Sequence, residues 1–297
     1  MNITFKQLRM MQALAETNSI SAAAKVMHVT QPTASMQLKE MSLAIGLPLY
    51  EVIGKKIYLT VIGLELAATA QDISRAWESF EQTVYASKGV NKGRLRIAVV
   101  STAKYFMPKL IASFCKKFPA IDVSLEILNR DGVLERLRSN RDDLYIMSMP
   151  PTDVALEDVI FMPNPIGLIA ASTNTLAKQK MVSLNDLKNH RFILREPGSG
   201  TRMAADQFFA KKKFKPNIRL ELGSNEGIKE AVAGGLGIGI ISLHALHGHL
   251  KEQGVSVVNV EGFPVKSAWH LVHLSAKQLS PVAQAFKQHM LHEIKVK

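Results

Sequence analysis

Cysteine is nearly absent from this chain of 297 residues, which contains a single one, Cys115. One cysteine excludes an internal disulfide and is typical of a protein from a reducing compartment. Because Cys115 lies between Phe114 and Phe118 in an apolar helical pattern, we expect a buried, inert thiol rather than a reactive one.

Long hydrophobic runs are missing as well. The longest apolar stretch, residues 234–243, is shorter than the ~20 residues that a helix needs to span a bilayer. Lys6 and Arg9 are not followed by the apolar core of a signal peptide. These absences predict a cytoplasmic protein that makes no membrane contact.

Motifs for catalysis or cofactor binding are also lacking. There is no phosphate-binding loop, and Gly198-Ser199-Gly200 does not have the spacing of a nucleophile elbow. His244, His247 and His249 have no acidic or thiol neighbour in the sequence, which favours a solvated loop over a metal site. We therefore expect no enzymatic activity, no catalytic residues, no metal and no cofactor.

Acidic residues are too few to balance the basic ones, and the net charge is +12. Residues 1–90 hold eight Lys or Arg and seven Asp or Glu, so +11 of this charge belongs to the remaining chain. A basic excess there favours anionic ligands, although an ordinary solvated basic surface fits equally well. A chain of this length suits two or three domains.

The first 45 residues have the pattern of three helices. Thr4 and Gln7 form a capping box before a helix over 5–17, and a short helix follows over 21–27. After a tight turn at 28–29, Thr30 caps a third helix that extends to Ile45. Its apolar positions lie on one face and its polar positions on the other. This arrangement predicts a helix-turn-helix motif.

A hairpin and a long helix follow. Residues 49–52 and 57–60 are predicted as two strands around Gly54-Lys55-Lys56, which would form a basic wing. Residues 61–88 are predicted as a linker helix with a heptad-like apolar stripe. We expect this stripe to pair with a second copy, although packing on the chain's own C-terminal domain is an alternative. The dimerisation stripe is Leu66, Ala70, Ile73, Trp77, Phe80 and Val84.

Beyond a glycine-containing hinge at 89–93, strands alternate with helices. This order predicts an α/β fold with mostly parallel sheets, here divided into two lobes with a cleft between them. We expect one domain over 94–297, with lobe I at about 94–163 and 265–297 and lobe II at about 164–264. Predicted strands cover 95–100, 121–128, 144–149, 167–171, 191–194, 218–222, 237–242 and 269–274, and predicted helices cover 106–118, 132–138, 201–212, 226–233 and 281–291.

Several of these helices begin with small hydroxyl residues or lie near cations. Helix N-termini offer free amides and a positive dipole end, so we expect an anionic ligand in the cleft. Ordinary helix caps would look the same when taken one at a time. The predicted ligand-binding residues are Ser101, Thr102, Lys104, Arg130, Arg195, Ser199, Gly200, Thr201, Arg202 and Asn225.

The N-terminal segment resembles the winged helix-turn-helix of LysR-type transcriptional regulators. The resemblance is carried by AETNSISAAAKVMHVTQPTAS, GLPLYE and KKIYLT, and by their spacing. It extends over the whole chain, because the linker helix and the two-lobed domain also fit. Ala22, Met36 and Val52 stand where the family often has Arg, and Ile62 stands where Ala is usual. These departures weaken the expected phosphate contacts but not the fold.

A narrower resemblance connects the chain to the regulators of Calvin-cycle (RuBisCO) operons, in which Met36 is ordinary. It is carried by TQPTASMQLK, LRIAVVSTAKYFMPKLIASFCKKFP, VLERLRSNRDDLYIMSMPP, LREPGSGTR and ELGSNEGIKEAVAGGLGI. The resemblance implies a C-terminal domain like a periplasmic binding protein. It also implies a homotetramer, control of carbon-fixation genes as an activator or a repressor, and a phosphorylated or nucleotide metabolite as effector. RNA polymerase is a further candidate partner.

The outer face of the third helix would enter the major groove of double-stranded DNA. Gln side chains suit adenine, Thr and Met suit the thymine methyl group, and Lys suits phosphates. A dimer would read an imperfect palindrome. The predicted DNA-binding residues are Thr30, Gln31, Pro32, Thr33, Ser35, Met36, Gln37, Lys39, Lys55 and Lys56.

Two functions from other classes compete with this interpretation. A solute-binding module or a transferase could be built on two such lobes, but neither has a use for residues 1–60. A nucleoid-type DNA binder without an effector would use the N-terminal segment alone.

Overall fold

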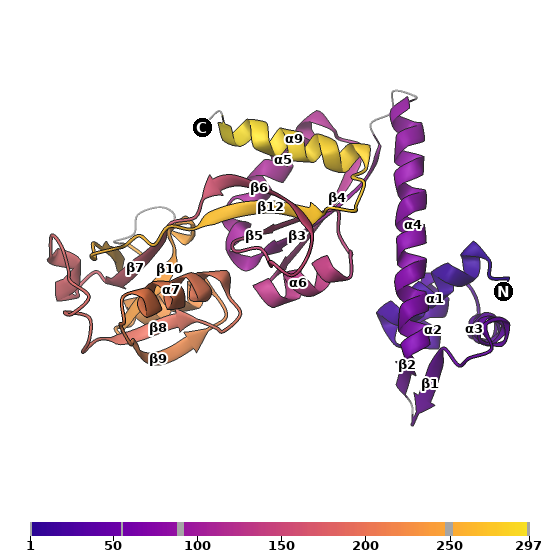
Figure 1. Ribbon diagram of the computed structural model, residues 1–297, viewed down its shortest axis with the longest axis horizontal. Helices are drawn as coiled ribbons and strands as arrows, with labels where there is room; N and C mark the ends of the chain where they lie inside the picture. Colours follow the sequence, from indigo (N-terminus) through magenta and orange to yellow (C-terminus); the bar gives the residue numbers. More distant parts are fainter. Residues whose placement is uncertain (1, 55, 88–91, 247–251, 296–297) are drawn as a thin grey trace. The chain divides into compact units, whose positions relative to one another are not determined.

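The computed structural model describes residues 2–54, 56–87, 92–246 and 252–295 (Figure 1). Contacts within the chain divide it into two compact units, Met1–Lys88 and Gly89–Lys297. Each unit has a hydrophobic core of its own.

The helix-turn-helix pattern of the first unit is confirmed. Helix α1 (Phe5–Thr17) has the expected capping box, in which the amide of Thr4 donates to Gln7 Oε1 at 2.9 Å. Helix α2 (Ile20–Val26) begins one residue earlier than expected, because Ser19 is its cap. Helix α3 (Gln31–Ile45) is capped by Thr30 and ends at Gly46, whose φ of 81° is a conformation that glycine tolerates.

The three helices enclose a small core. Met10, Met11 and Leu14 of α1 pack with Leu38 and Met41 of α3, and all five are completely buried. The wing consists of β1 (Tyr50–Ile53) and β2 (Lys56–Leu59), an antiparallel pair shifted by one residue from the prediction. Gly54 has a φ of 63° at its turn. Lys55 lies outside the described residues.

Helix α4 (Val61–Ser87) packs along α1 within the same unit. Ser74 donates to Gln12 Oε1 at 2.9 Å, and the ring of Trp77 lies 6.2 Å from that of Phe5. Ala70 of the predicted dimerisation stripe is completely buried within its own unit, so it is not available to a second copy. Leu66 is half-buried. Ile73, Trp77 and Phe80 remain 41%, 52% and 57% exposed, and Val84 is half-buried.

Lobe I of the second unit is a five-stranded sheet between helices, with strand order β4-β3-β5-β12-β6. Helices α5 and α9 cover one face and α6 covers the other (Figure 1). The strands are β3 (Gly93–Val100), β4 (Ile121–Leu128), β5 (Leu144–Met147), β6 (Leu156–Pro163) and β12 (Ala268–Leu274), and the helices are α5 (Met107–Lys117), α6 (Arg130–Arg138) and α9 (Pro281–Lys295). Cys115 of α5 is only partly buried.

Lobe II is a second five-stranded sheet, with strand order β11-β7-β10-β8-β9. Alternate residues of its strands face two cores: Phe192 and Leu194 lie on the side of helix α7, and Ile193 lies on the side of helix α8. The strands are β7 (Ile166–Ala171), β8 (Arg191–Arg195), β9 (Asn217–Leu222), β10 (Ile238–Ser242) and β11 (Val255–Val258), and the helices are α7 (Gly200–Lys211) and α8 (Asn225–Ala233).

Three short 3-10 helices lie in the connections of this unit. The first, η1, follows β3 directly and precedes α5, where the sequence predicted a loop leading into a helix. They are η1 (Ser101–Tyr105), η2 (Thr175–Lys178) and η3 (Leu243–Ala245).

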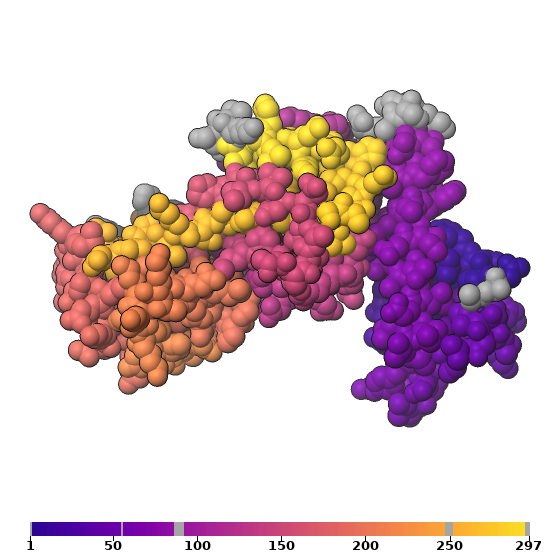
Figure 2. Space-filling view, viewed as in Figure 1, coloured from indigo at the N-terminus to yellow at the C-terminus, as the bar shows by residue number. Residues whose placement is uncertain are grey.

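Both sheets are mixed, which corrects the expectation of mostly parallel sheets. Strand β12 pairs antiparallel with β5 and β6, and β7 pairs antiparallel with β10 and β11. The cause is the connectivity: the segment that contains β12 runs from lobe II back to lobe I, as the yellow path in Figure 2 shows. Strands β6 and β11 were not predicted. The parallel strands β3, β4, β5 and β8, β9, β10 are those that the alternating pattern indicated.

Gly63 generates a stability prediction for the first unit. A Cβ atom at this position would collide with the backbone carbonyl of Leu49, so we expect Gly63→Ala to destabilise the unit by about 1–3 kcal/mol. Hydrogen exchange of peptides around Leu38 and Met41 measures this loss. Gly223→Ala is the control, since a Cβ there meets nothing within 4 Å. Unchanged protection in Gly63→Ala would contradict the packing described for α4.

Candidate functional sites

The outer face of α3 carries the residues predicted to read DNA. Gln31, Pro32 and Lys39 are exposed, and Met36 is 56% exposed although it is apolar. Thr33, Ser35 and Gln37 are half-buried beside them. Ala34, Leu38 and Met41, on the opposite face, are completely buried in the core. The protein itself therefore leaves the polar face of α3 open.

The predicted DNA-binding residues differ in their hydrogen bonds and in their exposure. The hydroxyl groups of Thr30 and Thr33 are 2.8 Å apart, so both are engaged in the local cap. Gln37 Oε1 is buried and has no hydrogen-bond partner in the described part of the chain. Lys56 is exposed at the start of β2 in the wing.

The two lobes of the second unit meet where parallel strands end. Gly200, at the start of α7, lies so close to Ser148 that a Cβ atom would collide with the serine hydroxyl group. Gly198 lies equally close to the carboxylate of Asp131 at the start of α6. Ligands of open α/β sheets bind outside the carboxyl ends of strands, and this contact brings two such edges together.

The helix N-termini at this edge differ in how they are capped. Asn129 caps α6 by accepting from the amide of Gly132 at 2.9 Å, and Ser224 caps α8 by accepting from Gly227 at 3.0 Å. These two ends are ordinary caps. Ser199 precedes α7 in the same way, but its side chain makes no capping hydrogen bond. The first amides of α7 therefore lack a side-chain acceptor.

Four hydroxyl residues with little exposure contribute to the same edge. Thr102, Ser148, Ser199 and Thr201 are each no more than 5% exposed, and no hydrogen bond of their hydroxyl groups is found within residues 2–54, 56–87, 92–246 and 252–295. These four hydroxyls, which we call the polar surface, are therefore available to a ligand.

Arg195 and Asn225 add two further unpaired atoms. Both residues are 2% exposed, and neither Arg195 Nη1 nor Asn225 Oδ1 has a hydrogen-bond partner among the residues described. The rest of the Arg195 guanidinium is engaged, because Nε donates to Glu196 at 2.7 Å and Nη2 donates to Ser101 Oγ at 3.1 Å. One buried donor and one buried acceptor therefore remain available.

Three cations predicted to face a ligand are held by the protein instead. Lys104 Nζ forms an ion pair with Glu226 at 2.9 Å. Arg202 binds Asp206, Glu221 and the carbonyl of Arg195. Arg130 donates two hydrogen bonds to the carbonyl of Met149, at 2.8 and 3.1 Å. Lys104 and Arg202 are therefore paired with carboxylates in this structure, and their role in ligand binding stays a prediction.

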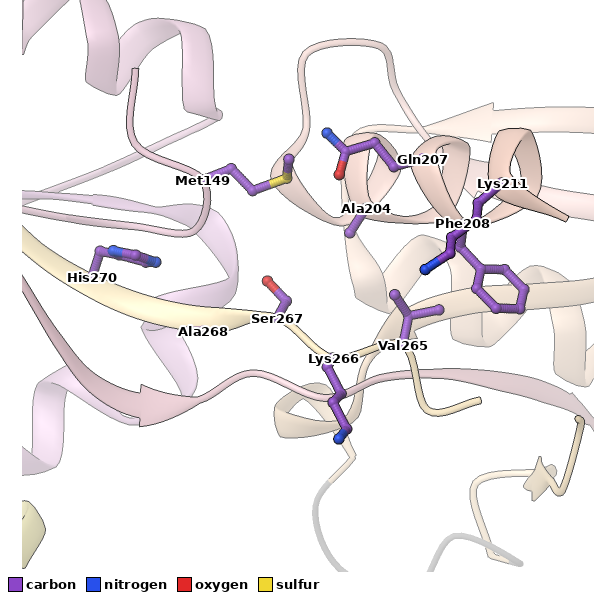
Figure 3. A pocket seen from close by; sticks show the side chains of 10 residues that line it. All are labelled: Met149, Ala204, Gln207, Phe208, Lys211, Val265, Lys266, Ser267, Ala268 and His270. Carbon is purple, nitrogen blue, oxygen red and sulfur yellow. The ribbon is translucent and has the colours of Figure 1, made fainter. Parts of the chain in front are cut away.

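A pocket of about 480 Å³ lies between α7 and the segment that crosses from lobe II to lobe I (Figure 3). Met149 follows Ser148, and Ala204 lies one turn along α7 from Gly200, so the pocket adjoins the polar surface. The sequence did not reveal it, because one face of α7 and the strand that crosses between the lobes form it together. Its lining is Met149, Ala204, Gln207, Phe208, Lys211, Val265, Lys266, Ser267, Ala268 and His270.

The charge of the pocket is positive. Lys211 and Lys266 have no carboxylate partner among the described residues, and the Lys211 side chain extends between α7 and Val265 (Figure 3). His270 is paired with Asp158 at 2.8 Å. The uncompensated cations of the cleft are therefore these two lysines rather than Lys104 or Arg202.

The described residues include neither a metal-binding cluster nor a membrane-spanning helix. No group of three or more His, Cys, Asp or Glu side chains is arranged to hold a metal ion. No described helix is both long and apolar enough to cross a membrane.

Comparison with known families finds two matches that together cover most of the chain. Residues 5–64 match the family described as "Bacterial regulatory helix-turn-helix protein, lysR family". Residues 88–295 match the family described as "LysR substrate binding domain".

Individual relatives agree over nearly the full length. The chain is 42% identical to the HTH-type transcriptional activator CmpR of Synechocystis, over 97% of this chain and 95% of that protein. It is 39% identical to a RuBisCO operon transcriptional regulator of Acidithiobacillus ferrooxidans, over 97% of this chain and 93% of that protein.

A solved structure resembles the second unit. It is the regulatory domain of CcmR from Synechocystis PCC6803 in complex with 2-PG, with 40% sequence identity and a TM-score of 0.66. The match covers 69% of this chain and 98% of the CcmR domain.

Proposed function

Because this chain belongs to the LysR family of bacterial transcriptional regulators, we propose that it controls carbon-fixation genes by binding their DNA in response to a small anionic metabolite. The observation that carries the proposal is 39% identity, over nearly the whole chain, to a regulator of a RuBisCO operon. We propose a cytoplasmic site of action, next to the DNA, and no enzymatic role. These relatives are named as regulators rather than enzymes.

Each proposed role belongs to one segment of the chain. Residues 1–60 bind DNA, residues 61–88 join two copies, residues 89–93 are the hinge, and residues 94–297 sense the ligand. The hinge residues 89–91 lie outside the described part of the chain. The sensor is built from two lobes, which meet at residues 163–166 and 265–268.

DNA is read by the exposed face of α3. Gln31 contacts an adenine edge, Met36 contacts a thymine methyl group, and Lys39 and Lys56 contact phosphates. The 56% exposure of Met36 supports this role, because its side chain is free to reach a base. Pro32, Ser35 and Gln37 complete the face, and Lys55 extends the wing.

Two copies present two such faces. The exposed side of α4 offers Ile73, Trp77 and Phe80 for pairing, and the ring of Trp77 lies between those of Phe5 and Phe80, at 6.2 and 5.6 Å. A dimer reads half-sites about 34 Å apart, or a multiple of that spacing. The assembly we propose is a homodimer that associates further into a tetramer, which also contacts RNA polymerase.

The ligand binds at the polar surface between the lobes. The uncapped amides of α7, the hydroxyls of Thr102, Ser148 and Thr201, and Arg195 Nη1 are donors for an anion. Asn225 Oδ1 accepts from a hydroxyl group of the ligand. A compact anion with one donor group fits this set. The 2-PG complex of the CcmR domain supports an anion of this kind.

Gln31→Ala tests base reading. Loss of a bidentate contact with adenine should lower the ratio of specific to nonspecific binding by about 10-fold. Gel shifts with the DNA upstream of the protein's own gene, against scrambled DNA, measure this ratio. Lys56→Ala is the contrasting variant: it should weaken both kinds of binding and reduce the salt slope by about 1. A Gln31→Ala variant that loses only nonspecific affinity contradicts the base-reading role.

Phe80→Lys tests the dimer surface. The variant places a lysine of each copy in the proposed interface between the two α4 helices. Burial of these charges should weaken self-association more than about 10-fold. Sedimentation of the full chain across a concentration series measures the change. Ile160→Lys, at another exposed apolar position on lobe I, is the control. An unchanged assembly in Phe80→Lys would place the pairing surface elsewhere.

Thr201→Val tests the ligand surface, because it removes a buried hydroxyl group and keeps the volume of the side chain. We expect affinity for 2-PG to fall by about 10-fold, the value of a hydrogen bond to a charged group. Titration calorimetry on the full chain provides the measurement, with Thr173→Val, an exposed position, as control. A wild-type chain that binds 2-PG no more tightly than inorganic phosphate would refute the effector proposal.

A further inference from the structure

Glu226 connects the two lobes through both of its carboxylate oxygens. Oε1 accepts a hydrogen bond from the hydroxyl group of Tyr105 at 2.6 Å, and Oε2 forms an ion pair with Lys104 Nζ at 2.9 Å. Tyr105 and Lys104 belong to η1 in lobe I, whereas Glu226 stands in the first turn of α8 in lobe II. Glu226 lies 121 residues from Tyr105 and 122 residues from Lys104 in the sequence.

The surroundings favour the ionised form of Glu226. Partial burial alone would raise its pKa, but hydrogen bonds from Tyr105 and Lys104 outweigh burial and lower the pKa to about 2. Its place in the first turn of α8 adds the favourable interaction of a negative charge with a helix N-terminus. Lys104 Nζ also lies 5.4 Å from the centre of the Tyr105 ring. The carboxylate of Glu226 is therefore ionised at neutral pH.

Segment η1 is attached to lobe II at both of its ends. At its start, Ser101 Oγ accepts from Arg195 Nη2 at 3.1 Å. At its end, the ring of Tyr105 packs against the apolar core on the α8 side of lobe II, which includes Ile228 and Val232. Thr102, which is 5% exposed, lies between these two attachments in sequence.

We propose that Glu226 is a positioning residue: it clasps η1 to lobe II in the free protein and so holds the cleft in the arrangement that accepts a ligand. Lys104 then acts through Glu226 rather than on the ligand. Neither Glu226, Lys104 nor Tyr105 lines the pocket between α7 and the crossing strand. A change in the clasp therefore alters how often the cleft is formed and leaves that lining intact.

The affinity for a ligand depends on the fraction of molecules in which Glu226 clasps η1. If only the clasped arrangement binds, the apparent Kd equals the intrinsic Kd divided by the fraction of molecules that are clasped. Glu226→Gln keeps the shape of the side chain and removes its charge. Tyr105→Phe keeps the packed ring and removes the hydroxyl group that hydrogen-bonds Glu226 and Asn225. Both variants lower the clasped fraction without deleting a proposed ligand contact.

Hydrogen exchange in the full-length, ligand-free protein tests the clasp directly. Peptides covering 101–106 and the start of α8 should exchange about 5-fold faster or more in Glu226→Gln and in Tyr105→Phe, while the core strands of both lobes keep their protection. Glu230→Gln, on the exposed side of α8, is the matched control and should match the wild type. Unchanged exchange of 101–106 in both clasp variants overturns the proposal.

A double-mutant cycle tests the link to the ligand, which rests on the proposed function. Lys104→Met and Glu226→Gln should each weaken 2-PG binding about 5-fold, and the double variant should bind as either single variant does. A further loss on adding Lys104→Met to Glu226→Gln means that Lys104 touches the ligand, and it overturns the positioning role.

Failure of the two proposals can be told apart. A wild-type chain that binds no 2-PG refutes the effector proposal, whereas the exchange experiment still decides the clasp because it needs no ligand. Faster exchange spread over every strand of a variant would indicate general destabilisation instead of a released clasp, and that result also overturns the proposal.

Discussion

In the second unit, the free-energy cost of burying polar groups without hydrogen-bond partners determines how the two lobes contact each other. Where the lobes meet, glycines at 198 and 200 let the backbone approach Asp131 and Ser148 more closely than a Cβ atom would allow. Each polar group that this contact buries must find a partner or lose the hydrogen bonds it had in water. Glu196 and Ser101 meet most of the demand of Arg195, and Glu226 meets that of Lys104. The groups left over define the place where a ligand is needed.

The same constraint separates ordinary helix caps from a binding surface. Asn129, Ser199 and Ser224 each precede a helix at this edge. Asn129 and Ser224 each accept a hydrogen bond from the first turn of their own helix. Ser199 makes no such bond, so the first amides of α7 lie without a side-chain cap beside the neighbouring hydroxyls. The ligand surface that we propose is thus smaller than the set of helix starts.

In the first unit the governing constraint is the apolar face of each helix. Helix α3 uses one face for the core and leaves the other to the solvent, which is what a surface for the major groove requires. Helix α4 divides its apolar residues between two partners. Ala70 faces the interior of its own unit, and the aromatic rings of Trp77 and Phe80 remain outside it. These exposed rings are the surface that we propose for the pairing of two copies.

The sequence by itself determined the local features of this protein: the capping box at Thr4, the cap at Thr30, the apolar face of α3 and the order of strands and helices. These depend on residues within about four positions of one another or on the period of the pattern. Only the tertiary structure decided that Arg202 and Lys104 are paired with Glu221 and Glu226, that Ala70 is buried, that half of the strand pairs in the two sensor sheets are antiparallel, and that a pocket joins α7 to the crossing strand. The physical reason is that these contacts join residues far apart in sequence, 19 positions for Arg202 and Glu221 and 122 for Lys104 and Glu226, which no local pattern encodes.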